Sequence, residues 1–98
     1  MGSDEGTLRP PAAPTASGLP NRKNKIELGS YEPADGVMFE IWRRHGDTVD
    51  WYLHATSSDP NYEDYDVKPG QYYEYKVRAV RGDAVSEFSP SAVAYGAE

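Results

Sequence analysis

Apolar or aromatic side chains occupy every second position from Tyr73 to Ala79, with charged side chains between them, and no other feature constrains the fold as much. A repeat of two is the period of a β-strand, in which successive side chains point to opposite faces of a sheet. Lys68-Pro69-Gly70 precedes it, and proline and glycine together are typical of a turn. One face carries Tyr73, Tyr75, Val77 and Ala79, and the other carries Tyr72, Glu74, Lys76, Arg78 and Val80. We therefore predict a long strand with one buried face.

Shorter runs with the same period occupy much of the remaining chain. Turn-forming residues separate them at a spacing of about ten residues, which favours a two-layered sandwich of antiparallel strands. No amphipathic helical pattern competes with this interpretation. The runs are Ile26–Leu28, residues 37–42 with Val37, Phe39 and Ile41 on one face, Trp51–Thr56, and Ala92–Tyr95.

Size and composition limit what such a fold can do. A chain of 98 residues forms one domain, and 38% hydrophobic residues suffice for one core. Without cysteine there is no disulfide and no thiolate, so zinc has only His45, His54 and carboxylates as ligands. A net charge of −6 argues against wrapping nucleic acid, and no apolar stretch is long enough to insert in a membrane. We expect no cofactor.

The N-terminal 25 residues differ in character from the rest. They hold four of the eight prolines and a net charge of +2, whereas residues 26–98 carry −8. Proline favours extended chain, so this stretch reads as an arm rather than a helix. We assign residues 1–12 to an extended arm, 13–95 to the sandwich and 96–98 to a tail. The candidate protein-binding residues in the N-terminal stretch are Leu8, Arg9, Pro10, Pro11, Leu19, Arg22 and Lys23.

The start of the chain lacks the basic and apolar regions of an export signal. If Met1 is the native start, we expect a protein that acts without secretion, such as a virion component. If Met1-Gly2-Ser3 is a cloning scar, we expect a module cut from a longer, extracellular protein.

The order of these features resembles a fibronectin type III domain of the bacterial and phage type, over residues 10–95. The resemblance is carried by Ala13-Pro14-Thr15, Phe39-Glu-Ile-Trp-Arg43, Asn61-Tyr-Glu-Asp64, Val67-Lys-Pro-Gly70, Tyr73-Glu-Tyr-Lys-Val-Arg-Ala-Val80 and Ser86-Glu-Phe-Ser-Pro-Ser91. It implies an all-β, immunoglobulin-like Greek-key sandwich of about seven antiparallel strands, without catalysis. It also implies that the Tyr73 hydroxyl bonds to nearby backbone. The family's core tryptophan is replaced by Ser30, and Trp51 or Tyr31 is expected to supply the missing bulk.

Arg81-Gly82-Asp83 follows the long strand and matches an integrin-binding tripeptide. Glycine permits a positive φ and aspartate tolerates the next turn position, so Gly82-Asp83 also forms a tight hairpin. We prefer the turn, with cell adhesion as the alternative.

Four carboxylates crowd one segment: Asp59, Glu63, Asp64 and Asp66. Calcium takes several oxygen ligands at such spacing, although the EF-hand glycine is absent. The alternative, which we prefer, is a solvated acidic strand that discourages pairing between sheet edges.

Trp42 is predicted to point away from the core, on the face that carries Tyr72. An exposed aromatic of this kind stacks on a sugar or anchors a protein contact. The simpler interpretation is a cation–π pair with Lys76 or Arg78. Glu40 and Glu74 are expected to pair with the same two cations, and we see no catalytic triad.

The sequence thus predicts a non-catalytic structural module that docks through its arm and sheet surface onto protein partners, with copies of itself among the candidates. A phage capsid-decoration or tail protein is the favoured setting. The alternatives are a spacer or weak carbohydrate-binding module of a secreted carbohydrate-active enzyme, and adhesion through Arg81-Gly82-Asp83.

Overall fold

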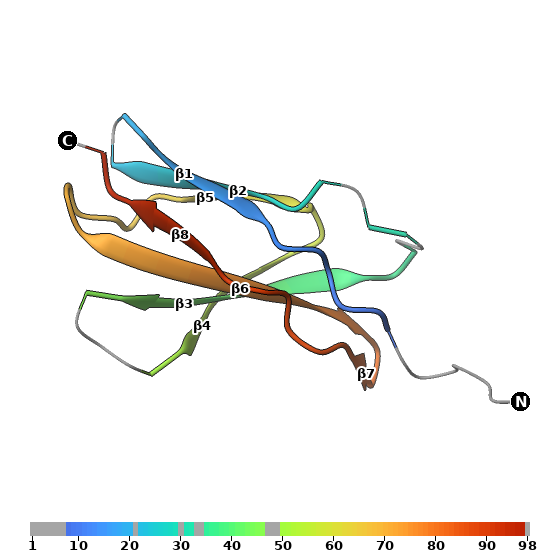
Figure 1. Ribbon diagram of the computed structural model, residues 1–98. Coiled ribbons are helices and arrows are strands. Elements are labelled where there is room, and N and C mark those ends of the chain that lie inside the picture. The colour runs from blue at the N-terminus through green and yellow to red at the C-terminus, as the bar shows by residue number, and fades with distance from the viewer. Residues whose placement is uncertain (1–7, 21, 30, 33–34, 47–49, 98) are drawn as a thin grey trace, which may run out of the picture.

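Two antiparallel sheets pack face to face in the computed structural model, which describes residues 8–20, 22–29, 31–32, 35–46 and 50–97 (Figure 1). The first sheet has the order β1-β2-β5. Its strands are β1 (Thr15–Leu19), β2 (Lys23–Glu27) and β5 (Asn61–Asp64). The described residues form strands and turns, and they contain no helix long and apolar enough to cross a membrane.

The second sheet has five strands, with the long β6 at its centre. Its order is β4-β3-β6-β7, and β8 pairs with β6 as well. β7 pairs with Val80 and Arg81 at one end of β6, while β8 pairs with residues 72–75 at the other. The two short strands together form one interrupted border strand. Counted in this way, the number of strands agrees with the expected total of about seven. The bounds are β3 (Met38–His45), β4 (Tyr52–Ser57), β6 (Tyr72–Arg81), β7 (Ala84–Val85) and β8 (Ala92–Tyr95).

The core lies between the sheets and is built from the predicted alternation. The inward side chains of β6 are Tyr73, Tyr75, Val77 and Ala79, each 2% exposed or less. Phe39 and Ile41 of β3 and Ile26 of β2 complete the same cluster. Each Å² of apolar surface that these side chains remove from water stabilises the folded state by about 25 cal/mol. The side chains that the period of two places on one face of the strand are thus the buried ones.

Tyr31, and not Trp51, fills the space left by the missing tryptophan. Its ring is buried and meets Phe39 edge to face, with 5.5 Å between ring centroids. Trp51 is only half-buried and lies under Arg44 and Lys76 instead. Ser30 lies outside the described residues.

The extended arm predicted over residues 1–25 needs correction. β1 and most of β2 fall in this stretch and pair with each other, from Thr15 opposite Glu27 to Leu19 opposite Lys23. β1 has small, mixed side chains and no clear alternation, so only its pairing with β2 reveals it as a strand. Leu8 packs against the core, and the Tyr31 hydroxyl donates to the Arg9 carbonyl at 2.6 Å. Residues 1–7 lie outside the described residues, and the boundary at residue 12 stays a prediction.

Tyr73 forms the expected contact with nearby backbone. Its hydroxyl accepts a hydrogen bond from the Lys68 N–H at 2.6 Å. The turn between the two residues is closed by the Gln71 N–H, which donates to the Lys68 carbonyl at 3.2 Å, and Gly70 supplies the positive φ of 77°. This contact joins the start of β6 to the chain that leaves β5.

Replacing Tyr73 by phenylalanine should remove this acceptor and leave the Lys68 N–H without its partner. We expect the free energy of unfolding to fall by about 1–3 kcal/mol, measured by urea denaturation. Tyr95→Phe is the control, because Tyr95 is largely exposed, and it should change stability by less than about 0.5 kcal/mol. Equal effects of the two substitutions would contradict the assigned role.

Candidate functional site

A cluster of buried polar side chains connects the two sheets. Arg43 of β3 and Asp64 of β5 form its centre, with 2.6 Å between Nη1 and Oδ2. Their side chains are only 6% and 0% exposed. A charge removed from water in this way is costly unless it is paired and hydrogen-bonded. The remaining contacts of the cluster show how this cost is offset.

Asp64 accepts hydrogen bonds from several directions. The Tyr75 hydroxyl donates to Oδ2 at 2.7 Å, the Asp66 N–H donates to Oδ1 at 3.0 Å, and His54 Nε2 lies 3.0 Å from Oδ1. Burial raises the pKa of the Asp64 carboxyl, but the hydrogen bonds from His54, Tyr75, the Asp66 N–H and Arg43 together hold that pKa well below its usual range. Asp64 is therefore an ionised carboxylate that only accepts, and Nε2 of His54 carries the proton.

The cluster continues into the neighbouring strands. Arg43 donates from Nε to the Tyr52 hydroxyl at 2.5 Å and from Nη1 to the Asp66 carbonyl at 2.9 Å. Asn24 of β2 donates to the Tyr75 hydroxyl at 2.9 Å. Burial and the bond to Asp64 raise the pKa of the Tyr75 phenol, so it stays protonated. Because these groups are engaged with one another and shielded from solvent, their arrangement serves structure rather than acid–base chemistry.

The structure does not bring together the four carboxylates considered as a calcium site. Asp64 points into the core, while Glu63 pairs with Lys23 at 3.4 Å. Asp66 reaches Arg43, and Asp59 accepts from the Asn61 N–H. In the part of the chain that the structure describes, no group of three or more His, Asp or Glu side chains is placed to hold a metal ion.

The outer face of the five-stranded sheet carries alternating cations and aromatic rings, which we call the cation–aromatic ladder. Its members follow in the order Arg44, Trp51, Lys76, Phe88, Arg78 and Trp42. The successive cation-to-ring-centroid distances are 4.9, 4.5, 4.1, 4.9 and 5.5 Å. Cation–π contacts at such distances contribute about 0.5–1 kcal/mol each at exposed sites. The ladder holds rings and cations in one arrangement before any partner arrives.

Two carboxylates hold the ends of the ladder. Glu40 accepts from Arg78 Nε at 2.6 Å and from Trp42 Nε1 at 3.0 Å. Burial raises the pKa of Glu40, but these two hydrogen bonds and the Arg78 charge bring it below its usual value. Glu74 accepts from Arg44 Nε at 2.8 Å and from the Tyr72 hydroxyl at 2.9 Å. The predicted Trp42–Arg78 and Glu40–Arg78 pairs are confirmed, whereas Glu74 pairs with Arg44 and not with Lys76.

Two members of this surface, Trp51 and Phe88, were not predicted from the sequence. Phe88 is placed by the serines beside it: the hydroxyls of Ser86 and Ser89 accept from the Ala79 and Val77 N–H groups of β6 at 2.8 and 3.0 Å. The chain is thereby held along β6, and the ring between the serines meets Trp42 edge to face. The spacing of serines around an aromatic residue was the only signal that could have indicated this.

Exposed apolar side chains gather on the same outer face. Of the six large hydrophobic residues that are exposed in the described chain, five share this face, and Tyr65 is the sixth. Their strand partners set the orientation, because Leu53 lies opposite Trp42, Val93 opposite Glu74 and Tyr95 opposite Tyr72. The five are Met38, Leu53, Val85, Val93 and Tyr95. Exposed apolar side chains that gather on one face of a protein are typical of interaction sites.

The other predicted binding residues lie elsewhere. Leu19 and Lys23 belong to the three-stranded sheet, and Arg22 occupies the turn between its first two strands with a φ of +61°. Leu8 and Pro11 are partly or fully buried, while Arg9 and Pro10 are exposed. The N-terminal candidates and the pair Trp42 and Tyr72 thus lie on different sheets or connections.

Arg81-Gly82-Asp83 forms a short hairpin turn. Arg81 pairs with Ala84, which leaves Gly82 and Asp83 as a two-residue loop, and Gly82 has a φ of +58°. Glycine at positive φ in the first position is typical of a type II′ turn. The preferred interpretation as a turn is confirmed, and Arg81 lies at a strand end.

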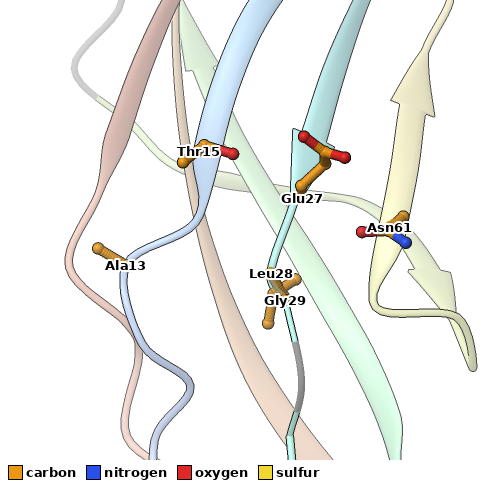
Figure 2. Close-up of a pocket in the computed structure, with 6 residues that line it drawn as sticks. All are labelled: Ala13, Thr15, Glu27, Leu28, Gly29 and Asn61. Carbon is orange, nitrogen blue, oxygen red and sulfur yellow. The ribbon is translucent and has the colours of Figure 1, made fainter.

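Two hollows mark the surface. One, of about 550 Å³, is lined by Ala13, Thr15, Glu27, Leu28, Gly29 and Asn61 (Figure 2). Thr15, Glu27 and Asn61 are register partners across β1, β2 and β5. Among these described lining residues, Glu27 carries the titratable side chain. The second, of about 230 Å³, is lined by Arg43, His45, Asp66, Lys68, Gln71 and Tyr73.

Comparison with known proteins gives structural neighbours only. No protein-family model and no curated protein matches the sequence. Domains A168–A170 of titin match with a TM-score of 0.78 and 12% identity over 94% of this chain. An Fn3-like protein from Clostridium thermocellum matches with a TM-score of 0.69 and 22% identity, over 90% of this chain and 95% of its own length. The FN1–FN3 domains of chicken CNTN1 match with a TM-score of 0.67 and 25% identity over 93% of this chain. This chain spans 33% of the titin structure and 36% of the CNTN1 structure.

Asp64→Asn should leave the buried Arg43 charge without its counterion. We expect a loss of about 3–5 kcal/mol at pH 7 in the free energy of unfolding. Asp66→Asn is the matched control, since Asp66 also contacts Arg43 but has an 87% exposed side chain, and it should cost less than about 1 kcal/mol. Comparable losses in the two variants would contradict the central role of Asp64.

The same carboxylate, which is the most deeply buried one with a lowered pKa, contributes to the acid stability of the fold. Below the unfolded-state pKa of about 4, the unfolded chain binds a proton that folded Asp64 does not bind. Stability should therefore be constant above about pH 5 and fall as the pH drops below 4, measured by urea denaturation from pH 2 to 7. Asp64→Asn should flatten this dependence, and an unchanged slope in the variant would argue against it.

Proposed function

We propose that this chain, which has the fibronectin type III fold, is a non-catalytic module that binds other proteins through the outer face of its five-stranded sheet. The fold bears out the resemblance to a fibronectin type III domain, including the two antiparallel sheets and the hydroxyl contact of Tyr73. Domains of this fold generally serve as interaction or spacer modules. The proposal for this chain rests on its own surface.

One observation carries the proposal: the exposed apolar side chains of the described chain are concentrated beside the cation–aromatic ladder. Protein interfaces are enriched in aromatic residues, methionine and arginine, and a few of these residues dominate affinity. Side chains that are already held in place lose little conformational entropy on binding. The ladder fixes Trp42, Phe88 and Arg78, so the face is prepared for a partner.

The charges of the face favour an acidic partner. Three cations, Arg44, Lys76 and Arg78, lie there against two carboxylates, Glu40 and Glu74, in a chain whose net charge is −6. Complementary charge speeds association and excludes unsuitable partners more than it increases affinity. We infer that apolar contact supplies most of the binding energy and that the cations orient the partner.

The finer proposal is that the partner belongs to a larger assembly such as a phage virion, with this chain as a capsid-decoration or tail protein. The sequence feature behind it is the net charge of +2 on residues 1–25 against −8 on residues 26–98, which favours contact between neighbouring copies or partners. Two of these cations, Lys23 and Lys25, already pair with Glu63 and Glu27 within the chain. A virion location follows from that proposal, and an extracellular location follows if the chain is a module of a secreted protein.

The alternative of a carbohydrate site at Trp42 has less support. The Trp42 ring is engaged by Arg78 and Phe88, and its Nε1 donates to Glu40. A ring held on several sides offers little open surface for a sugar. Adhesion through Arg81-Gly82-Asp83 is weakened by the two-residue loop, because Arg81 is paired with Ala84 in the strand.

A photoactivatable phenylalanine analogue at residue 93 tests the binding face directly. Val93 is 43% exposed on the outer face, and the matched position is Tyr65, which is 66% exposed away from it. We expect residue 93 to cross-link to one protein of the source particle or extract, and residue 65 not to do so. In subsequent titrations with that purified protein, Val93→Asp should weaken binding about tenfold or more, and Tyr65→Asp about twofold or less.

Thermal unfolding of both variants shows whether the fold is intact. Cross-linking at residue 65 but not at 93, or equal affinities of the two aspartate variants, would overturn the proposal.

A further inference from the structure

β4 forms one border of the five-stranded sheet, and its outer edge is open. Within the described ranges, its backbone pairs with β3 alone. Figure 1 shows β4 at the rim of the molecule, beyond β3. An open edge presents unpaired N–H and C=O groups that can pair with another extended chain.

The other sheet borders carry features that oppose such pairing. β5 is four residues long, follows Pro60 and includes Glu63. β1 lies against β8, so closely that a Cβ on Gly18 would come within 2.2 Å of the Tyr95 carbonyl oxygen. The border of β7 and β8 is interrupted by the segment 86–91, which contains Pro90 and bonds back to β6 through Ser86 and Ser89. Short strands, charges and prolines are the usual protections of an edge.

β4 lacks the short length, the charges and the proline of these borders, and the protection that it does carry is a β-bulge. Tyr52-Leu-His-Ala-Thr-Ser57 contains no proline, glycine, lysine, arginine or acidic residue. The register between β3 and β4 shifts at Ile41 and Trp42, which places a bulge at His54. The His54 side chain turns inward to Asp64 and to the ring of Tyr62. The bulge therefore tethers the strand from the core side and fixes the position of its open edge.

Acidic residues stand at both ends of this edge. Asp50 precedes β4 by two residues and Asp59 follows it by two, and both are exposed. The chain between them is extended over β4 and bends from Ser58 onward, where the Asp59 side chain accepts from the Asn61 N–H. If two copies paired antiparallel through β4 about its centre, Asp50 of each would face Asp59 of the other. That repulsion, together with the net charge of −6, disfavours a second copy and favours an extended segment with basic ends.

We propose that the outer edge of β4 binds, by strand addition, an extended segment of a partner protein that has uncharged, β-prone residues in its middle and lysine or arginine at both ends. Backbone hydrogen bonds hold the middle of the segment, and Asp50 and Asp59 select its ends. This site is separate from the outer face proposed above, since it uses the edge of the sheet and different charged residues.

A ten-residue peptide tests the site on the full 98-residue chain. It has two lysines at each end and six alternating threonines and valines between them, and it carries a fluorescent label for anisotropy titration. We expect it to bind about tenfold or more tighter than the same peptide with glutamates at its ends. A third peptide with proline at a central position should lose binding, because it cannot complete the ladder. Amide hydrogen exchange should slow at residues 52–57.

A double charge reversal makes the test independent of fold stability. Asp50→Lys with Asp59→Lys should reverse the preference, so that the glutamate-ended peptide binds more tightly. Asp83→Lys with Glu87→Lys is the matched control, because it makes the same change of charge at exposed positions beside β7, on the opposite border of the sheet, and should keep the original preference. Three results would overturn the proposal: no slowing of exchange in β4, the same peptide preference in both double variants, or dimerisation through β4 in sedimentation experiments.

Discussion

The buried ion pair between Arg43 and Asp64 is the interaction on which the arrangement of the two sheets depends. It joins the middle of the five-stranded sheet to the border of the three-stranded one, and Tyr75, His54 and Asn24 add hydrogen bonds from three further strands. Such a pair adds little net stability compared with a well-packed apolar core, but removing one partner leaves an uncompensated charge. The pair therefore penalises any packing of the sheets that separates the two groups, and it holds the bulge of β4 in place through His54.

The outer face proposed for binding is positioned by the same strand, β3. Because side chains alternate along β3, turning Arg43 inward places Trp42 and Arg44 outward, on either side of it. These two residues form the opposite ends of the cation–aromatic ladder, and β6 supplies Lys76 and Arg78 between them. The interior charge that orders the fold and the exterior surface proposed for binding are thus fixed by one register between β3 and β6.

Much of this was accessible from the sequence wherever the signal was local. The alternation predicted the buried face of β6 and the inward residues of β3, and neighbouring strands made the Glu40–Arg78 pair foreseeable. Features that depend on contacts between distant segments were not predictable from the local sequence pattern. An aspartate among other acids suggests solvent exposure, yet Asp64 is buried, because its partners come from strands far away in the sequence. β1 has no alternation of its own, and Phe88 joins the ladder only through the serines that hold it against β6.

The sequence by itself determined that this chain forms strands, which of their faces are apolar and where the turns lie, since these depend on steric preferences within a few residues. Tertiary structure decided which strands meet, which carboxylate is buried, which aromatic residue replaces the missing tryptophan and which edge stays open. These outcomes depend on register and on the packing of one layer against another. Residues 21 positions apart, such as Arg43 and Asp64, meet only after both have been fixed.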